Sequence, residues 1–188
     1  MNNFNLHTPT RILFGKGAIA DLRDQIPQGA RVLITYGGGS VKKTGVLDQV
    51  HDALKGLDVL EFGGIEPNPS YETLMNAVNI VRDEKVTFLL AVGGGSVLDG
   101  TKFIAAAAQY DEGVDPWRIL ETRGNDVKSA VPMGSVLTLP ATGSESNSGA
   151  VISRKTTGDK LAFMTPFVQP VFAVLDPVYT YTLPPRQV

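Results

Sequence analysis

Four short apolar runs rich in β-branched residues alternate with segments of helical periodicity, and this alternation constrains the fold more than any other feature. The runs cover residues 31–36, 57–62, 86–92 and 135–140, and helical segments separate the first three. Strands joined by helices lie parallel, because a parallel pair needs a long crossover connection. The alternation therefore predicts an α/β fold in which a Rossmann-like parallel sheet is flanked by helices.

Apolar residues in the connecting segments recur at the spacing of a helix face. Val46, Val50 and Leu54 do so after the first run, and a similar pattern follows the cap residues of PNPS after the second. After the third run, Ser96 is a favourable N-cap, so we expect a helix from Ser96 through Ala108. Each helix can cover a face of the sheet.

Three other stretches depart from this rhythm. Residues 150–164 predict an inserted β-hairpin around a Gly-Asp turn, and residues 169–176 predict one more buried strand. Residues 4–15 predict an edge strand or short hairpin, before a helix that carries Ile19 and Leu22. An exposed edge strand recruits a partner strand, so we also expect a homodimer.

The pentapeptide GGGSV occurs at residues 37–41 and again at 93–97, each time directly after an apolar run. Glycine loses more backbone freedom on folding than any other residue, so a triple glycine is expected where the backbone approaches something closely. Helix N-termini favour anions, and ligands of open α/β sheets bind at the carboxyl ends of the strands. With the loop after the fourth run, TLPATGSESNSG, the two copies predict a site for an extended ligand that contains a pyrophosphate.

Alternatives to this interpretation remain open. Neither copy fits the G-x-G-x-x-G fingerprint, because the sixth residue is Lys42 in one and Leu98 in the other. Residues 95–102, GSVLDGTK, approach the P-loop of phosphotransferases, but Thr101 precedes Lys102 where that motif needs the reverse order. Either copy alone could also be a tight strand-to-helix turn without a ligand.

The composition is that of an ordinary globular protein and argues against several functions. The net charge of −2 gives nucleic acid no basic surface, and no apolar run approaches the length of a membrane span. The N-terminal residues lack the basic and apolar segments of a secretory signal, and the chain has no cysteine. We therefore expect a cytoplasmic protein with a small-molecule ligand, and neither nucleic acid nor a membrane as partner.

The segment GGGSVLD, followed some forty residues later by LTLPATGSESN, resembles the iron-containing (group III) alcohol dehydrogenase family. The PATGSE form is similar to its NADPH-dependent butanol dehydrogenase and aldehyde reductase branch, and the resemblance covers essentially the whole chain. It implies an NADP(H)-binding domain of a metal-dependent enzyme that interconverts aldehydes and primary alcohols by hydride transfer. Two alternatives are a dehydroquinate-synthase-like lyase domain and a non-catalytic NADP-binding or dimerisation module.

The first loop follows the strand where NAD-specific proteins place an acid on the adenosine ribose. It contains no acid and is followed by Lys42 and Lys43, which predicts NADP(H) rather than NAD(H). The resemblance adds further residues that border the cofactor. The expected cofactor-binding residues are Gly37, Gly38, Gly39 and Ser40 in the first loop, then Gly94, Gly95, Ser96, Asp99, Thr138, Thr142, Ser144, Asn147, Lys160, Tyr179 and Leu183.

The resembled family holds a divalent metal, Fe²⁺ or Zn²⁺, with one aspartate and three histidines in an all-helical C-terminal domain. This chain contains only His7 and His51, and we expect both to be surface or packing residues. Thr182 and the prolines after it indicate a helix start close to the last residue. We therefore expect residues 1–188 to be the dinucleotide-binding, N-terminal half of a longer enzyme, with a boundary near 182–188. Alone it would lack catalytic and metal residues and be inactive.

Overall fold

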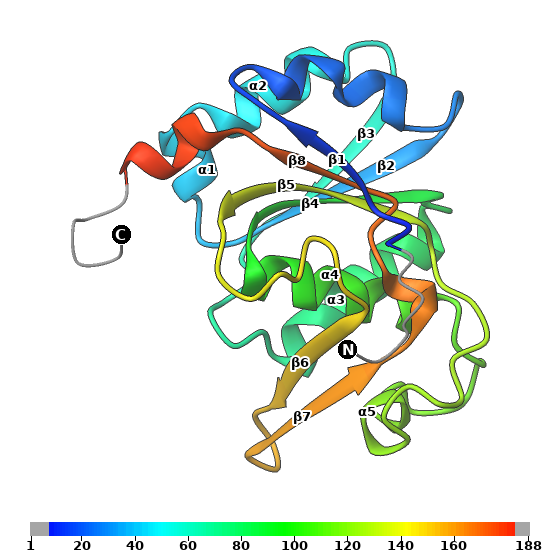
Figure 1. The fold of residues 1–188 in the computed structure, drawn as a ribbon. Coiled ribbons are helices and arrows are strands. Elements are labelled where there is room, and N and C mark those ends of the chain that lie inside the picture. The colour runs from blue at the N-terminus through cyan, green and yellow to red at the C-terminus, as the bar shows by residue number, and fades with distance from the viewer. Residues whose placement is uncertain (1–7, 183–188) are drawn as a thin grey trace, which may run out of the picture.

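A six-stranded parallel sheet forms the centre of the computed structural model, which describes residues 8–182 (Figure 1). Its strands are β1 (Arg11–Phe14), β2 (Arg31–Tyr36), β3 (Asp58–Phe62), β4 (Phe88–Gly94), β5 (Met133–Leu139) and β8 (Phe172–Leu175). They lie in the order β1-β8-β5-β4-β2-β3. Each neighbouring pair runs in the same direction, so the predicted α/β fold with a Rossmann-like sheet is confirmed.

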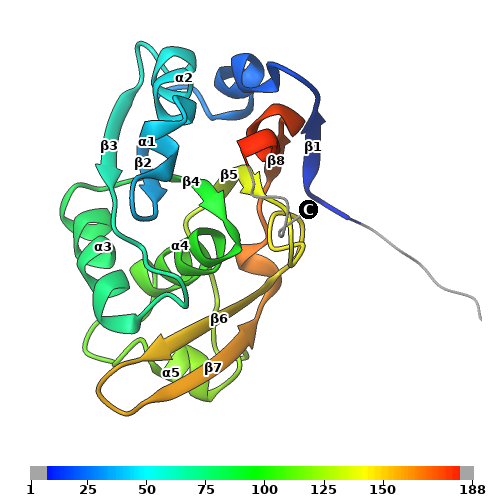
Figure 2. The ribbon, with the colours of Figure 1, turned by 90° about the vertical axis from the view of Figure 1, so that its left-hand side faces the viewer.

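Helices cover both faces of this sheet (Figure 2). One face carries the 3₁₀ helix η1 (Ala18–Gln25) with α1 (Ser40–Lys43) and α2 (Val46–Ala53). The other face carries α3 (Tyr71–Asp83) and α4 (Gly95–Ala108). Three further short helices are α5 (Arg118–Glu121), η2 (Pro166–Val168) and η3 (Pro177–Thr182).

Each face of the sheet has its own apolar core, because successive side chains of a strand point to opposite faces. Ile34 packs with residues of η1 and α2, whereas Leu33 packs with residues of α3 and α4. Both faces of the central strands are buried, which accounts for their continuous apolar sequences. The hydroxyls of Thr35 on β2 and Thr101 on α4 are 2.6 Å apart and hydrogen-bonded, which satisfies two polar groups inside this core.

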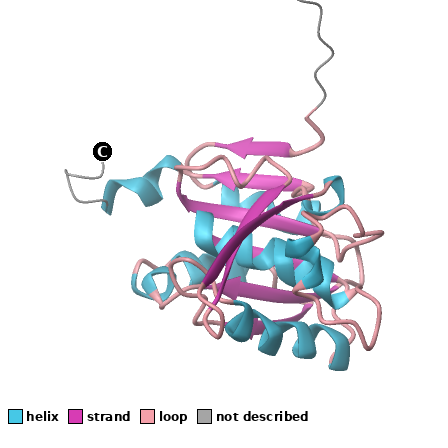
Figure 3. Ribbon diagram, turned by 90° about the horizontal axis from the view of Figure 1, so that it is seen from below, coloured by secondary structure: helices cyan, strands magenta, loops and turns pink. Residues whose placement is uncertain are grey.

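The predicted β-hairpin is confirmed as a separate antiparallel sheet of β6 (Gly149–Arg154) and β7 (Asp159–Met164). It packs on α4 and α5, outside the helical layer, and its strands cross the direction of the main sheet (Figure 3). The turn differs in detail from the predicted Gly-Asp turn. Four residues, 155–158, connect the strands; Gly158 supplies the positive φ of 75°, and Asp159 already belongs to β7.

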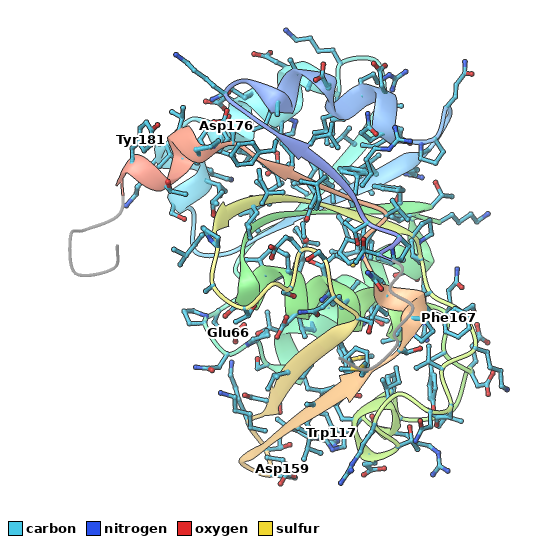
Figure 4. All side chains as sticks on the ribbon, in the orientation of Figure 1. Glu66, Trp117, Asp159, Phe167, Asp176 and Tyr181 are labelled. Atoms are coloured by element: carbon cyan, nitrogen blue, oxygen red, sulfur yellow. The ribbon has the colours of Figure 1, made fainter. Side chains whose placement is uncertain are left out.

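Carboxylates near the start of α3 hold the tip of the hairpin. Glu72 accepts hydrogen bonds from the backbone N–H groups of Lys155 and Thr156. Glu66, labelled in Figure 4 on the loop before α3, accepts from Lys155 Nζ at 2.7 Å and from the hydroxyl of Ser70 at 2.8 Å. Burial raises the pKa of Glu66, but these and other hydrogen bonds outweigh it and lower the pKa to about 2. The hairpin is therefore fixed to α3 at neutral pH.

Two local predictions need correction. The predicted helix 96–108 begins at Gly95, and its N-cap is Gly94 rather than Ser96. The reason is that β4 extends through Gly93 and Gly94 and enters α4 without an intervening loop. The helix predicted around Ile19 and Leu22 is a 3₁₀ helix.

Strand β1 occupies the edge of the sheet, as predicted, and pairs in parallel with β8. Two of its apolar side chains face outward: Ile12 is 50% exposed and Phe14 is 73% exposed. Within residues 8–182, no helix combines the length and the apolar character that a membrane span requires.

Candidate functional site

The first GGGSV is an open loop between β2 and α1. Gly39 has a φ of 99°, a conformation that favours glycine, and it caps α1, which begins at Ser40. A Cβ atom on Gly37 would lie 3.1 Å from the carbonyl oxygen of Ile65, whereas Cβ positions on Gly38 and Gly39 are surrounded by open space. The loop therefore leaves room beside its backbone.

The second GGGSV is a close-packed junction between β4 and α4. A Cβ atom on Gly93 would lie 2.7 Å from Cγ2 of Val97, and one on Gly95 would lie 2.9 Å from Oγ1 of Thr142. Glycine is required here by neighbouring atoms rather than by an unusual φ. The two copies thus have different structural roles, although their sequences are identical.

Three adjoining cavities include most of the expected cofactor-binding residues. The first two lie at the carboxyl ends of β4 and β5, and the third lies beside α4 and the hairpin. Leu139 lines the first two, and Asp99 and Thr142 line both the second and the third, so the three cavities adjoin one another; together they are called the groove below. The first cavity has a volume of 240 Å³ and is lined by Ser40, Gly94, Thr138 and Tyr179. The second, of 340 Å³, is lined by Gly95, Ser96, Asp99, Thr142 and Lys160. The third, of 490 Å³, is lined by Asp99, Thr142, Ser144 and Asn147.

Four expected residues fall outside this lining. Gly37, Gly38 and Gly39 do not line the three cavities, but they lead directly into Ser40, which does. Leu183 lies outside the described residues.

Asn68 is a groove residue that the sequence analysis missed. Its backbone has a φ of 56°, which is unusual for a residue other than glycine, and its Oδ1 accepts a hydrogen bond of 2.8 Å from Lys160 Nζ. Both side chains line the middle cavity. The available signal was the PNPS segment, where two prolines flank Asn68 and restrict the turn.

Lys102 is a second residue whose role the sequence analysis missed. Its side chain is fully buried, and Nζ donates to Ser144 Oγ at 2.9 Å, Asn147 Oδ1 at 2.9 Å and the carbonyl oxygen of Gly149 at 2.8 Å. Burial lowers the pKa of Lys102 to about 8, against the opposing effect of Asp99 and Glu145. Thr101 is also fully buried, so neither residue is available to a phosphate and the P-loop alternative is wrong.

A cluster of charged and aromatic side chains lies beside the first loop. Lys42 Nζ is 3.8 Å from Glu61 Oε2 and 4.9 Å from the centre of the Tyr36 ring. Glu61 also accepts from Tyr36 Oη at 2.9 Å and is hydrogen-bonded to His51 Nε2 at 2.7 Å. The charge of Lys42 is therefore shared with a carboxylate from β3 that the sequence analysis did not consider.

The described residues do not fit the family's metal-ligand set. Between residues 8 and 182, no group of three or more histidine, cysteine, aspartate or glutamate side chains is arranged to hold a metal ion. His51 is partly exposed and contacts Glu61, and His7 lies outside the described residues.

The parallel sheet, with cavities at the carboxyl ends of its strands, defines a Rossmann-like α/β domain. The chain belongs to the iron-containing alcohol dehydrogenase family, whose model matches residues 9–177. This assignment favours the alcohol dehydrogenase interpretation over the dehydroquinate-synthase-like alternative.

Individual relatives agree with this assignment. The chain is 85% identical over 188 residues to the NADPH-dependent aldehyde reductase YqhD of Escherichia coli (strain K12), covering 100% of this chain and 49% of that protein. It is 48% identical over 187 residues to the probable NADH-dependent butanol dehydrogenase 1 of Bacillus subtilis (strain 168), covering 98% and 48%. The crystal structure of E. coli K-12 YqhD superposes with a TM-score of 0.96 at 84% identity, covering 99% of this chain and 48% of that one. The chain thus spans about half the length of these relatives.

Proposed function

We propose that this chain is the NADP(H)-binding domain of a metal-dependent alcohol dehydrogenase or aldehyde reductase that interconverts aldehydes and primary alcohols. The observation that carries the proposal is the row of adjoining cavities, which begins beside the first loop and passes the glycine junction of β4 and α4. The 85% identity to an NADPH-dependent aldehyde reductase supports it. A bound nicotinamide cofactor would supply the hydride for this reaction.

The residues of the groove suit the parts of a dinucleotide. Gly94 caps a helix of fourteen residues that begins with Gly95 and Ser96, and the N–H groups and dipole of this helix favour a pyrophosphate. Lys160, held by Asn68, adds a positive charge to the same cavity. Toward the nicotinamide ribose, the groove offers a row of polar residues. These are Asp99, Thr142, Ser144 and Asn147, whereas Thr138 lines the cavity beside the first loop.

The first loop supports a preference for NADP(H). Gly38 and Gly39 have open space where side chains would stand, and the segment 37–43 contains no carboxylate that would repel a 2′-phosphate. The nearest carboxylate identified in this cluster, Glu61, is engaged by Lys42, Tyr36 and His51. The named relatives include both NADPH-dependent and NADH-dependent enzymes, so the loop rather than the family supports this choice.

The remaining parts of the proposal concern the whole protein. Residues 1–188 would form its N-terminal half, with a boundary near 182–188, and the divalent metal would be held elsewhere in the full-length enzyme. The outer edge of β1, which pairs with no other strand among residues 8–182 and carries exposed Ile12 and Phe14, supports a homodimer formed through this strand. We also propose a cytoplasmic location. A non-catalytic NADP-binding or dimerisation module is the alternative function.

Calorimetric titration of the purified chain with NADPH and NADH tests the central proposal. We expect NADPH to bind at least about tenfold more tightly, since one unfavourable or missing charge pair is worth a tenfold change or more. Equal affinities would contradict the NADP(H) preference, and no binding of either nucleotide would contradict the dinucleotide site. We also expect no stoichiometric metal by elemental analysis and no aldehyde turnover by this chain alone.

A further inference from the structure

Lys102 has a buried ammonium group whose three N–H donors are all used by one short segment of the chain. The acceptors are Ser144 Oγ, Asn147 Oδ1 and the carbonyl oxygen of Gly149, between 2.8 and 2.9 Å away. An ammonium has three N–H donors and no acceptor, so this arrangement saturates it. A neutral amine would have only two donors for three acceptors.

The same segment forms a wall of the groove. Ser144 and Asn147 line its largest cavity and also accept hydrogen bonds from Lys102. Ser144 Oγ also donates to Asp99 Oδ1 at 2.7 Å, and Asp99 Oδ2 accepts from the backbone N–H of Val151 at 3.0 Å. A single network, anchored on the buried Lys102, thus joins α4, the loop after β5 and the first residues of β6.

We propose that Lys102 is a positioning residue for nucleotide binding: its protonated amine holds residues 142–149 in the shape that presents Thr142, Ser144 and Asn147 to the groove. This inference rests on the proposed function, because it concerns the affinity of the same groove for NADP(H). Lys102 acts through its partners, since its own side chain is fully buried.

The charges around Lys102 determine how this role depends on pH. Its hydrogen-bond partners are uncharged; the charged groups that act on it are Asp99, on its own helix, and Glu145, on the loop after β5. Burial is the larger effect and lowers the pKa of Lys102 to about 8. An anionic nucleotide in the adjoining groove favours the ammonium, so binding takes up a proton above about pH 8. NADPH affinity should therefore be constant below this pH and fall above it.

Folding stability should change in the opposite direction. Between about pH 8 and 10.5, the unfolded chain keeps the lysine proton that the folded chain has lost. The unfolded state then binds more protons, so the contribution of Lys102 to the free energy of unfolding rises with pH over this range. A purely structural lysine would not make nucleotide affinity fall while stability rises.

Calorimetric titration of the full chain with NADPH, repeated between about pH 6.5 and 9.5, tests the proposal. In the unaltered chain we expect the Kd to rise by up to about tenfold per pH unit above the pKa, as for one proton. Lys102→Met should weaken NADPH binding by about tenfold at pH 7, because it removes three hydrogen bonds that shape the groove. It should also remove the part of the pH dependence of the Kd that arises from the Lys102 amine. Lys128→Met is the matched control, since Lys128 is 82% exposed, and it should behave like the unaltered chain.

Hydrogen exchange of the same variants separates the possible outcomes. In Lys102→Met we expect faster exchange in residues 142–149 and unchanged exchange in β2 and β4. Equal affinity and equal pH profiles for Lys102→Met and the unaltered chain would overturn the role of Lys102. If the unaltered chain does not bind NADPH, the proposed function fails. Separately, unchanged hydrogen exchange of residues 142–149 in Lys102→Met would overturn the positioning role. If Lys102→Met does not fold, Ser144→Ala takes its place and should shift the pH step; an unshifted step would contradict the proposal.

Discussion

Lys160 Nζ and Asn68 Oδ1 are 2.8 Å apart, and this hydrogen bond joins the hairpin to the loop before α3 across the middle cavity of the groove. The flexible lysine is thereby held beside Gly95 and Ser96, which line the same cavity. Asn68 supports this geometry with a left-handed backbone, a conformation that asparagine adopts more readily than most residues. Its amide and its backbone therefore contribute separately to the site.

Two substitutions at Asn68 separate these contributions. Asn68→Gly removes the amide but keeps the backbone free to adopt a φ of 56°, whereas Asn68→Ala removes the amide and also imposes a left-handed cost of about 1 kcal/mol. Both should weaken NADPH binding severalfold by calorimetry, because Lys160 loses its partner. The alanine variant should also be less stable than the glycine variant in urea denaturation; equal stabilities would contradict the backbone argument.

The open first loop makes Gly39 a test of nucleotide choice. Gly39→Asp places a carboxylate where a 2′-phosphate is proposed, and at about 4 Å each charge pair would cost about 4 kcal/mol at an intermediate dielectric. Gly39→Asn is the matched control, because it has the same shape and the same strain at a φ of 99° without the charge. We expect the aspartate, relative to the asparagine, to erase or reverse the preference for NADPH over NADH. Identical ratios of the two Kd values in both variants would refute the placement.

Acid should weaken the attachment of the hairpin to α3 through Glu66. The pKa of this carboxyl is about 2 in the folded chain and about 4.5 in the unfolded chain, so its contribution to the free energy of unfolding is complete above about pH 4.5. That contribution is lost as the pH falls from about 4.5 to 2, because the unfolded state takes up the proton first. Glu66→Gln should flatten this part of the stability profile measured by urea denaturation. The exposed Glu112→Gln serves as control and should leave the profile unchanged.

Packing between β5 and β8 leaves no room for a side chain at Gly134. A Cβ atom there would lie 2.2 Å from Cζ of Phe172, whose ring stacks on Phe88 with 6.0 Å between centroids. Gly134→Ala should therefore lower the free energy of unfolding by about 3 kcal/mol, whereas Gly38→Ala, with open space around its Cβ, should change it little. Combining Gly134→Ala with Phe172→Leu should cost less than the sum of the two single changes. An additive double variant would show that the ring is not the obstacle.

The sequence predicts the main elements well because local patterns determine them. The continuous apolar sequence of β2 and the Ser70 cap of α3, whose hydroxyl accepts from the Thr73 N–H, can both be identified from neighbouring residues. The start of α4 could not be identified from neighbouring residues, because Ser96 is a good N-cap when considered alone. Only the packing of Gly93 on Val97 in the folded chain carries β4 directly into the helix.

The buried network of the groove was equally inaccessible from sequence. Lys102 and its acceptors are separated by 42 to 47 residues, and no local pattern indicates that a lysine in an alanine-rich helix turns inward. The cluster of Lys42 and Glu61 escaped notice for the same reason, since Glu61 reaches it from a different strand. Residues that contact one another only after folding carry no signal in a single sequence.

The pairing of β1 with β8 sets an order of events while the chain is being made. Leu13 and its partner Val174 belong to opposite ends of the described chain, so β1, the first of the described strands to be made, must wait for β8, the last of them, before it has a neighbour. Until then the nascent chain can pair β2 with β3 and β4, but the side of β5 that β8 will cover stays open to other chains. Pulse-labelling hydrogen exchange during refolding should accordingly find β2 and β4 amides protected before those of β1 and β8. Translation speed over the final third of this domain thus governs how long an unfinished sheet edge is exposed to aggregation.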